Sequence, residues 1–172
     1  MKPLITILIL FVYTNIYGQQ VDVNTEIKKD FNDYYALIAE KKIDNALDYT
    51  NPKMFEIVPR EQMKSLMEAV YKMPNLEYKT GIPVFIKFDS LKHINNENYV
   101  RFYIISTIEM KFLDVEINDD KVSQMTKSFE AKFGTGNVMF DKASGFYKIK
   151  AEKIIIASCD NELKDWKFVS VD

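Results

Sequence analysis

Apolar residues near the start of the chain recur every three or four positions. Ile27, Phe31 and Tyr34 follow this spacing, which predicts a helix with one buried face that continues to about residue 38. Asn24 or Thr25 is placed to cap its first turn.

Three further helical segments are predicted before residue 75. Residues 43–49 form a short helix that ends at Asn51-Pro52, and residues 54–57 add one more turn. Pro59 is placed as the first residue of a longer helix, where its missing N–H costs nothing, and Pro74 ends it.

The pattern changes to alternation from Leu76 onward, which predicts strands. Residues 77–88 are expected to form one strand, in which Gly81 and Pro83 mark a bulge or an edge, and residues 89–94 extend it. Residues 95–98 form a turn. The clearest strand covers residues 99–113, and its buried face is expected to carry Val100, Phe102, Ile104, Ser106, Ile108, Met110 and Phe112.

A helix over residues 118–132 follows, capped by Asn118 and closed by Gly134. Strands are then predicted over residues 137–140, 146–158 and 163–171. Helices followed by long antiparallel strands predict a single α+β domain over residues 19–172, in which the N-terminal helices pack on one face of a bent sheet and the helix at 118–132 is inserted between strands.

The first eighteen residues predict a secretory leader. Lys2 precedes an apolar run from Leu4 to Tyr13 that is too short to span a bilayer, and Gly18 offers a small residue at the cleavage point. We therefore expect an exported, periplasmic or extracellular protein that starts near Gln19. The cleavage point lacks the Cys of a lipoprotein, so no membrane anchor is expected.

Composition argues against nucleic-acid binding and against a fold stabilised by disulfides. The chain has 23 basic and 25 acidic residues, a net charge of −2, and no concentrated basic segment, which argues against nucleic-acid binding. Cys159 is the only cysteine and cannot form an intrachain disulfide, so stability must come from packing.

Two segments resemble the nuclear transport factor 2-like superfamily, which has a cystatin-like α+β fold. Residues 31–49 are similar to the family's opening helices and Pro turn, and Asp165-Trp166-Lys167-Phe168 follow a long strand and a polar turn as in its last strand. The resemblance implies a strongly curved sheet, a cone-shaped half-barrel with a cavity under the helices. The helix at 118–132 departs from the family's plain hairpin, which leaves open whether it covers the sheet or closes the pocket. Members include isomerases, dehydratases, hydrolases and pure interaction modules, so the fold alone does not decide function.

Residues suited to catalysis are few. His93 is the only histidine and lies beside a turn, and Cys159 next to Asp160 is expected to be a small strand residue rather than a nucleophile. The carboxylate and tyrosine candidates are Glu109 with Tyr103 on the polar face of the long strand, and Asp33 on the first helix. The acidic run at 114–120 lacks the spacing of a calcium loop, and no metal or cofactor is expected.

Binding without catalysis is therefore the leading hypothesis. The protein is expected to have a pocket for a small apolar ligand or a surface for a protein partner of the cell envelope. The residues expected to line the pocket are Tyr34, Tyr35, Phe102 and Trp166. One alternative is an isomerase or hydrolase that uses a pocket carboxylate and a tyrosine. Another is a purely structural dimer, since the second face of the long strands carries apolar residues such as Ile105, and a homodimer through this face is expected.

Overall fold

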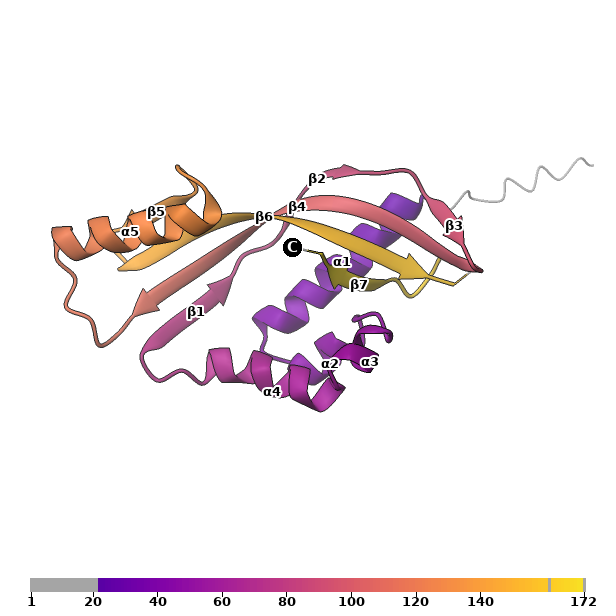
Figure 1. Cartoon of the computed structure of the whole chain (residues 1–172), viewed down its shortest axis with the longest axis horizontal. Coiled ribbons are helices and arrows are strands. Elements are labelled where there is room, and N and C mark those ends of the chain that lie inside the picture. Colours follow the sequence, from indigo (N-terminus) through magenta and orange to yellow (C-terminus); the bar gives the residue numbers. More distant parts are fainter. Residues whose placement is uncertain (1–21, 161, 172) are drawn as a thin grey trace, which may run out of the picture.

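The computed structural model describes residues 22–160 and 162–171, so the predicted leader over residues 1–18 lies outside the described residues. The predicted α+β fold is confirmed, since helices are followed by an antiparallel sheet that stays open, with one helix inserted between its strands (Figure 1). The helices are α1 (Val23–Ala39), α2 (Ile43–Leu47), α3 (Met54–Ile57), α4 (Arg60–Tyr71) and α5 (Asp119–Phe133). The strands are β1 (Leu76–Thr80), β2 (Val84–Phe88), β3 (Lys92–Ile94), β4 (Glu97–Phe112), β5 (Val138–Asp141), β6 (Phe146–Cys159) and β7 (Lys167–Ser170).

The residue that caps helix α1 is Asp22, not the predicted Asn24 or Thr25. The helix therefore begins earlier than predicted, at Val23. The Asp22 carboxylate accepts a hydrogen bond from the Asn24 backbone N–H (3.2 Å) and another from the Thr25 hydroxyl (2.6 Å). Pro59 likewise lies just before α4, whose first residue is Arg60. These corrections shift a helix start by one to three residues. Ile27 and Phe31 of α1 are buried as predicted, whereas no residue of α4 is fully buried.

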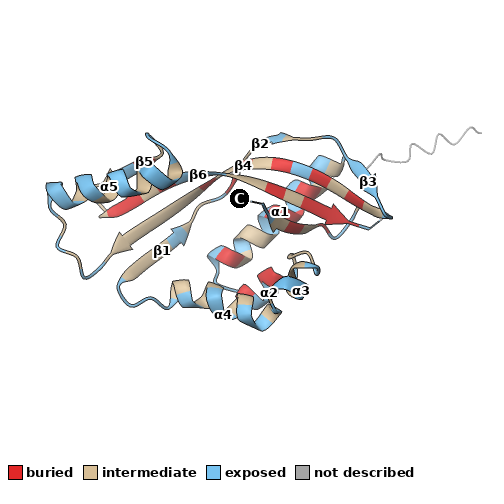
Figure 2. Ribbon diagram, in the orientation of Figure 1, coloured by how far each residue is buried: buried red, intermediate tan, exposed pale blue. Residues whose placement is uncertain are grey.

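Strands β4 and β6 form the axis of the sheet (Figure 1). They pair without interruption from Asn98 opposite Cys159 to Met110 opposite Tyr147. A two-residue turn with positive φ at Asn95 (50°) and Asn96 (64°) joins β3 to β4, a conformation that asparagine tolerates well. The predicted alternation in β4 is confirmed from Asn98 to Ser106, where every even-numbered residue is buried (Figure 2). Residues 107–112 are all of intermediate burial, so Ile108, Met110 and Phe112 are not buried as predicted.

The single strand predicted over residues 77–88 is in fact two strands, β1 and β2, which both pair with β4. The break falls at Gly81, whose N–H donates to the Thr107 carbonyl at 2.8 Å and where an added Cβ would lie only 3.2 Å from Thr107 Cβ. The bulge occurs later, between Phe85 and Lys87. The glycine is therefore explained by a close backbone approach rather than by a bulge.

The last strand is shorter than predicted. Positive φ values at Leu163 (57°) and Asp165 (52°) are incompatible with an extended chain, so β7 begins only at Lys167. Trp166 consequently lies in the loop before the strand, not on it.

The described sheet narrows to two strands in its middle. Strand β4 pairs with β2 over residues 102–105 and with β1 over residues 108–112, while β6 pairs with β5 over residues 146–149 and with β7 over residues 155–158. Between these ladders lie residues 106–107 of β4, opposite residues 150–151 of β6, which we call the waist. The waist divides the sheet into a β2–β7 half and a β1–β5 half.

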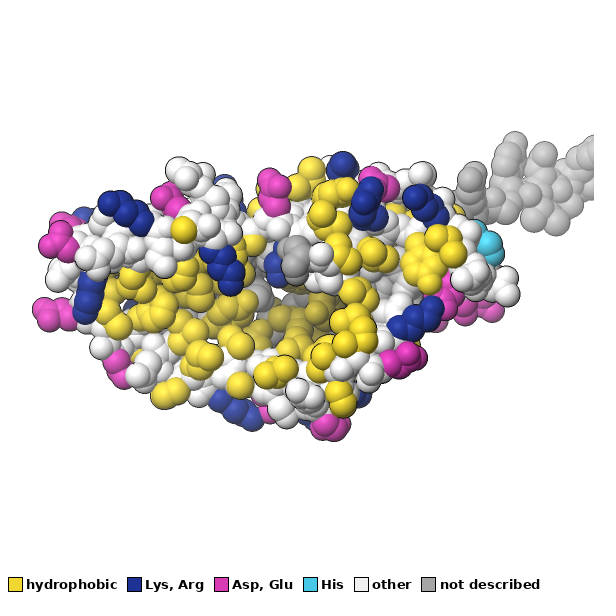
Figure 3. Space-filling model, viewed as in Figure 1, with side chains coloured by type: hydrophobic (Ala, Val, Ile, Leu, Met, Phe, Trp, Pro, Cys, Tyr) yellow, Lys and Arg dark blue, Asp and Glu magenta, His cyan; other side chains and the backbone are white. Residues whose placement is uncertain are grey.

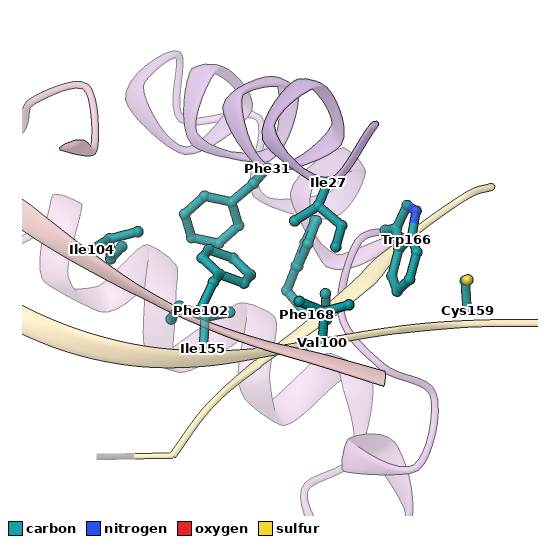
Figure 4. Packing of buried hydrophobic residues seen from close by; sticks show 10 residues of the cluster. Ile27, Phe31, Val100, Phe102, Ile104, Ile155, Cys159, Trp166 and Phe168 are labelled. Carbon is teal, nitrogen blue, oxygen red and sulfur yellow. The ribbon is translucent and has the colours of Figure 1, made fainter. Parts of the chain in front are cut away.

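Each half is covered on the same face by a different helix. In the β2–β7 half, Ile27 and Phe31 of α1 point toward Phe102, Phe168 and the other buried residues of the strands (Figure 4). In the β1–β5 half, Phe129 of α5 packs with Phe112 and Tyr147. Strand alternation puts Phe102, Phe112 and Tyr147 on one face of the continuously paired strands, so α1 and α5 cover the same face in different halves of the sheet. We call this the inner face and the opposite one the outer face.

Candidate functional site

A cavity of about 190 Å³ opens on the inner face where α1 and α5 leave the sheet uncovered. Helix α4 and strand β1 close its sides, and Figure 3 shows apolar side chains gathered over the hollowed face between α4 and α5. The lining residues are Tyr34, Tyr35 and Ile38 of α1, Met67, Val70 and Tyr71 of α4, Tyr78 and Thr80 of β1, Ser106 and Ile108 of β4, and Lys153 of β6.

Four tyrosines give this cavity an aromatic wall. Tyr34 and Tyr35 meet edge to face with ring centroids 5.7 Å apart, and Tyr71 and Tyr78 do the same at 5.6 Å. Such edge-to-face pairs are a favoured arrangement of aromatic rings and hold each ring in place. The tyrosines therefore form a preformed surface rather than a set of loose side chains.

Two of the tyrosine hydroxyls are engaged within the protein. The Tyr71 hydroxyl donates to the Ile38 carbonyl oxygen at 3.2 Å, and the Tyr35 hydroxyl donates to Ser106 Oγ at 3.4 Å. Ser106 is buried at the waist, so its bond to Tyr35 ties α1 to the narrowest part of the sheet.

The other polar groups of the wall have free hydrogen-bonding capacity. Burial, with a smaller contribution from the neighbouring Tyr35 and Tyr71, raises the pKa of Tyr34 to about 12. Burial likewise raises the pKa of Tyr78 to about 12. Both hydroxyls are therefore protonated at neutral pH, and Thr80 Oγ1 is buried without a hydrogen-bond partner among the described residues.

Lys153 is the one charged side chain among the described residues of the lining. Lys153 lies on β6 and pairs with Ile104 of β4. It is on the same face of β6 as the buried Ala151 and Ile155. Lys153 was not among the predicted site residues, because the apolar run at residues 154–156 is the more conspicuous pattern there. The alternation of side chains along β6 could have identified it, since this alternation places Lys153 on the inner face.

The predicted pocket residues divide into two groups. Tyr34 and Tyr35 line the cavity. Phe102 and Trp166 are fully buried in the closed core beneath α1 (Figure 4). Neither residue lines the cavity, so the prediction was wrong for these two.

The predicted catalytic candidates are not brought together. Glu109 and Tyr103 share the outer face of β4 but lie six residues apart, which at about 3.3 Å per residue is about 20 Å. Glu109 lies opposite Lys79 and Lys148, while Tyr103 carries Lys87 Nζ 4.0 Å from its ring centroid. Asp33 is half exposed on α1 and pairs with Lys29 at 3.4 Å.

Neither His93 nor Cys159 has the setting of a catalytic group. His93 is exposed, and its Nδ1 lies 3.1 Å from Asn98 Oδ1. Cys159 is buried, and this burial together with the charge of Asp160 raises the pKa of its thiol to about 11. At neutral pH the thiol is protonated and is a poor nucleophile.

Among residues 22–160 and 162–171, no group of three or more His, Cys, Asp or Glu side chains is arranged to hold a metal ion. Within the same residues, no helix combines the length and the apolar character needed to cross a membrane. A search against models of known protein families finds no match, and a search of curated proteins finds none with significant sequence similarity. The site must therefore be interpreted from its own geometry.

Proposed function

We propose that this protein is a binding domain that takes up a small, mainly apolar molecule in the cavity between α1, α4 and the waist. The observation that carries the proposal is the wall itself, in which four tyrosines and several aliphatic side chains surround about 190 Å³ of space. Ligand pockets are typically concave and apolar, with a few polar groups that set orientation, and this cavity fits that description.

The composition of the wall favours binding over catalysis. An isomerase or hydrolase of the kind considered above needs a carboxylate beside the bound molecule, and no Asp or Glu is found among the described lining residues. Asp30 is a buried carboxylate nearby, but its Oδ2 accepts the backbone N–H of Trp166 at 3.0 Å and serves the core.

The family and the location of the protein remain part of the proposal. We propose an exported member of the nuclear transport factor 2-like group, since helices on one face of a strongly bent open sheet, with a cavity beneath them, agree with that architecture. Intact mass of protein isolated from its source tests the export: a mature chain that starts at or near Gln19 is expected, and retention of residues 1–18 in the exported protein would contradict it.

A plug variant tests the binding function. Val70→Phe adds volume inside the cavity, while Val84→Phe makes the same change on an edge strand where the side chain is 60% exposed. Saturation-transfer NMR with toluene is expected to show binding to the mature wild type and to Val84→Phe, and loss of binding to Val70→Phe. Thermal melts establish that both variants are folded, since overpacking costs about 1–3 kcal/mol. Absence of toluene binding, or equal binding to all three proteins, would overturn the proposal.

A further inference from the structure

The cavity contains a positive charge with no partner in the protein. Across the described parts of the chain, Lys153 makes no ion pair or hydrogen bond, and its neighbours in the wall are mainly aromatic and aliphatic. A half-buried charge in apolar surroundings is costly unless something pairs with it. The described lining of the cavity contains no carboxylate that could pair with Lys153.

Hydroxyl donors surround the same space. Tyr34 of α1 and Tyr78 of β1 both line the cavity. Tyr34 and Tyr78 make no hydrogen bond within residues 22–160 and 162–171, and both keep their protons at neutral pH. An ionised carboxylate accepts up to about four hydrogen bonds and donates none, which suits a wall of donors.

The size of the cavity limits the rest of the molecule. An engineered apolar cavity of about 150 Å³ holds benzene. The cavity here, at about 190 Å³, fits one aromatic ring or a short alkyl chain together with a small polar group.

We infer that the bound molecule is a small monocarboxylate, with its charge paired to Lys153 and its single-ring or short-chain body against the tyrosines. This inference rests on the proposed binding function and adds the chemical class of the ligand. A cationic ligand, which tyrosine cages also bind, is disfavoured by Lys153 and by Lys41, whose Nζ lies 5.6 Å from the Tyr71 ring centroid. A dianion such as a phosphate ester is matched less well, because no arginine is found among the described lining residues.

Three probes of one shape separate the charge from the apolar body. Phenylacetate is anionic, phenylacetamide is its neutral counterpart, and phenethylammonium is cationic. Calorimetric titration of the mature protein is expected to give at least tenfold tighter binding of phenylacetate than of phenylacetamide, and the weakest binding for phenethylammonium.

Two matched variants assign the preference to one side chain. Lys153→Met should abolish the preference for phenylacetate over phenylacetamide while toluene still binds, and Lys150→Met, three residues away at an exposed position of the same strand, should leave it intact.

The outcomes distinguish the two levels of the proposal. If toluene and phenylacetamide bind but phenylacetate gains nothing, or keeps its gain in Lys153→Met, the carboxylate inference is wrong and the binding function stands. If none of the probes binds to the folded wild type, both are wrong.

Discussion

Trp166 connects the helical layer to the sheet through both its side chain and its backbone. The indole is fully buried beside Ile27 of α1 (Figure 4), and the backbone N–H donates to Asp30 of the same helix. A single loop residue thus fixes α1 over the β2–β7 half.

Replacing this side chain should therefore be among the most destabilising changes in the core. We expect Trp166→Ala to lower the free energy of unfolding by about 3–5 kcal/mol, because it removes a large, fully buried group. Denaturant unfolding measures the change, with Ile82→Ala, at a position 84% exposed, as a control that should change by less than about 0.5 kcal/mol. Equal stability of the two variants would show that the indole is not packed as described.

The cavity tyrosines should titrate late. Tyr34 and Tyr78 have pKa values raised by burial to about 12, whereas a tyrosine in an unfolded chain ionises near pH 10. The unfolded state therefore loses these protons first, so their contribution to stability is complete below about pH 10 and is lost as the pH rises toward 12.

Tyrosinate absorbance measures this directly. A late step is expected in the folded protein, reduced by one tyrosine in Tyr34→Phe and in Tyr78→Phe and by two in the double variant. Ionisation of all the tyrosines in one step near pH 10 would contradict the burial of these hydroxyls.

The side-chain cap of helix α5 contributes to the stability of its first turn. Its N-cap Asn118 accepts the Lys121 backbone N–H at 2.9 Å, and no residue of the helix is fully buried. We expect Asn118→Ala to cost about 0.5–2 kcal/mol of stability, measured by thermal melting. Ser123→Ala, at an exposed position inside the same helix, is the matched control and should be neutral or slightly stabilising. A larger effect from Ser123→Ala would contradict the assigned helix start.

The elements were predictable where a single period governs them. The alternation in the first part of β4 and the cap of α5 could be predicted, because both depend only on residues that are close together in the sequence. The break between β1 and β2 could not, because it depends on the approach of Gly81 to Thr107, a contact between residues far apart in the sequence. The cavity was half predictable for the same reason: Tyr34 and Tyr35 could be placed on the inner side of α1, whereas Lys153 becomes a site residue only once β6 is paired with β4.

At the scale of the whole molecule, the outer face of the sheet remains available for association. Ile105, Ile154 and Ile156 lie on this face and are only partly buried, and α5 packs on the opposite face. We expect a symmetric homodimer through the outer face, since a self-complementary patch closes on itself.

Light scattering of the mature protein at micromolar concentration tests this association. A dimer mass is expected for the wild type and for Ile57→Lys, which changes an isoleucine that is 75% exposed on α3, away from the sheet. Ile105→Lys should give a monomer. A monomeric wild type, together with unchanged solubility and melting of Ile105→Lys, would remove the dimer hypothesis.

The waist gives the molecule a mechanical property. A two-stranded ribbon twists more than a wide sheet, so we expect torsion between the two halves to concentrate at residues 106–107 and 150–151. The cavity spans this joint, with α1 on one side and β1 on the other, and we expect its width to change with that torsion. A molecule seated there is expected to brace the joint and to slow amide exchange at Ala151 relative to the empty protein.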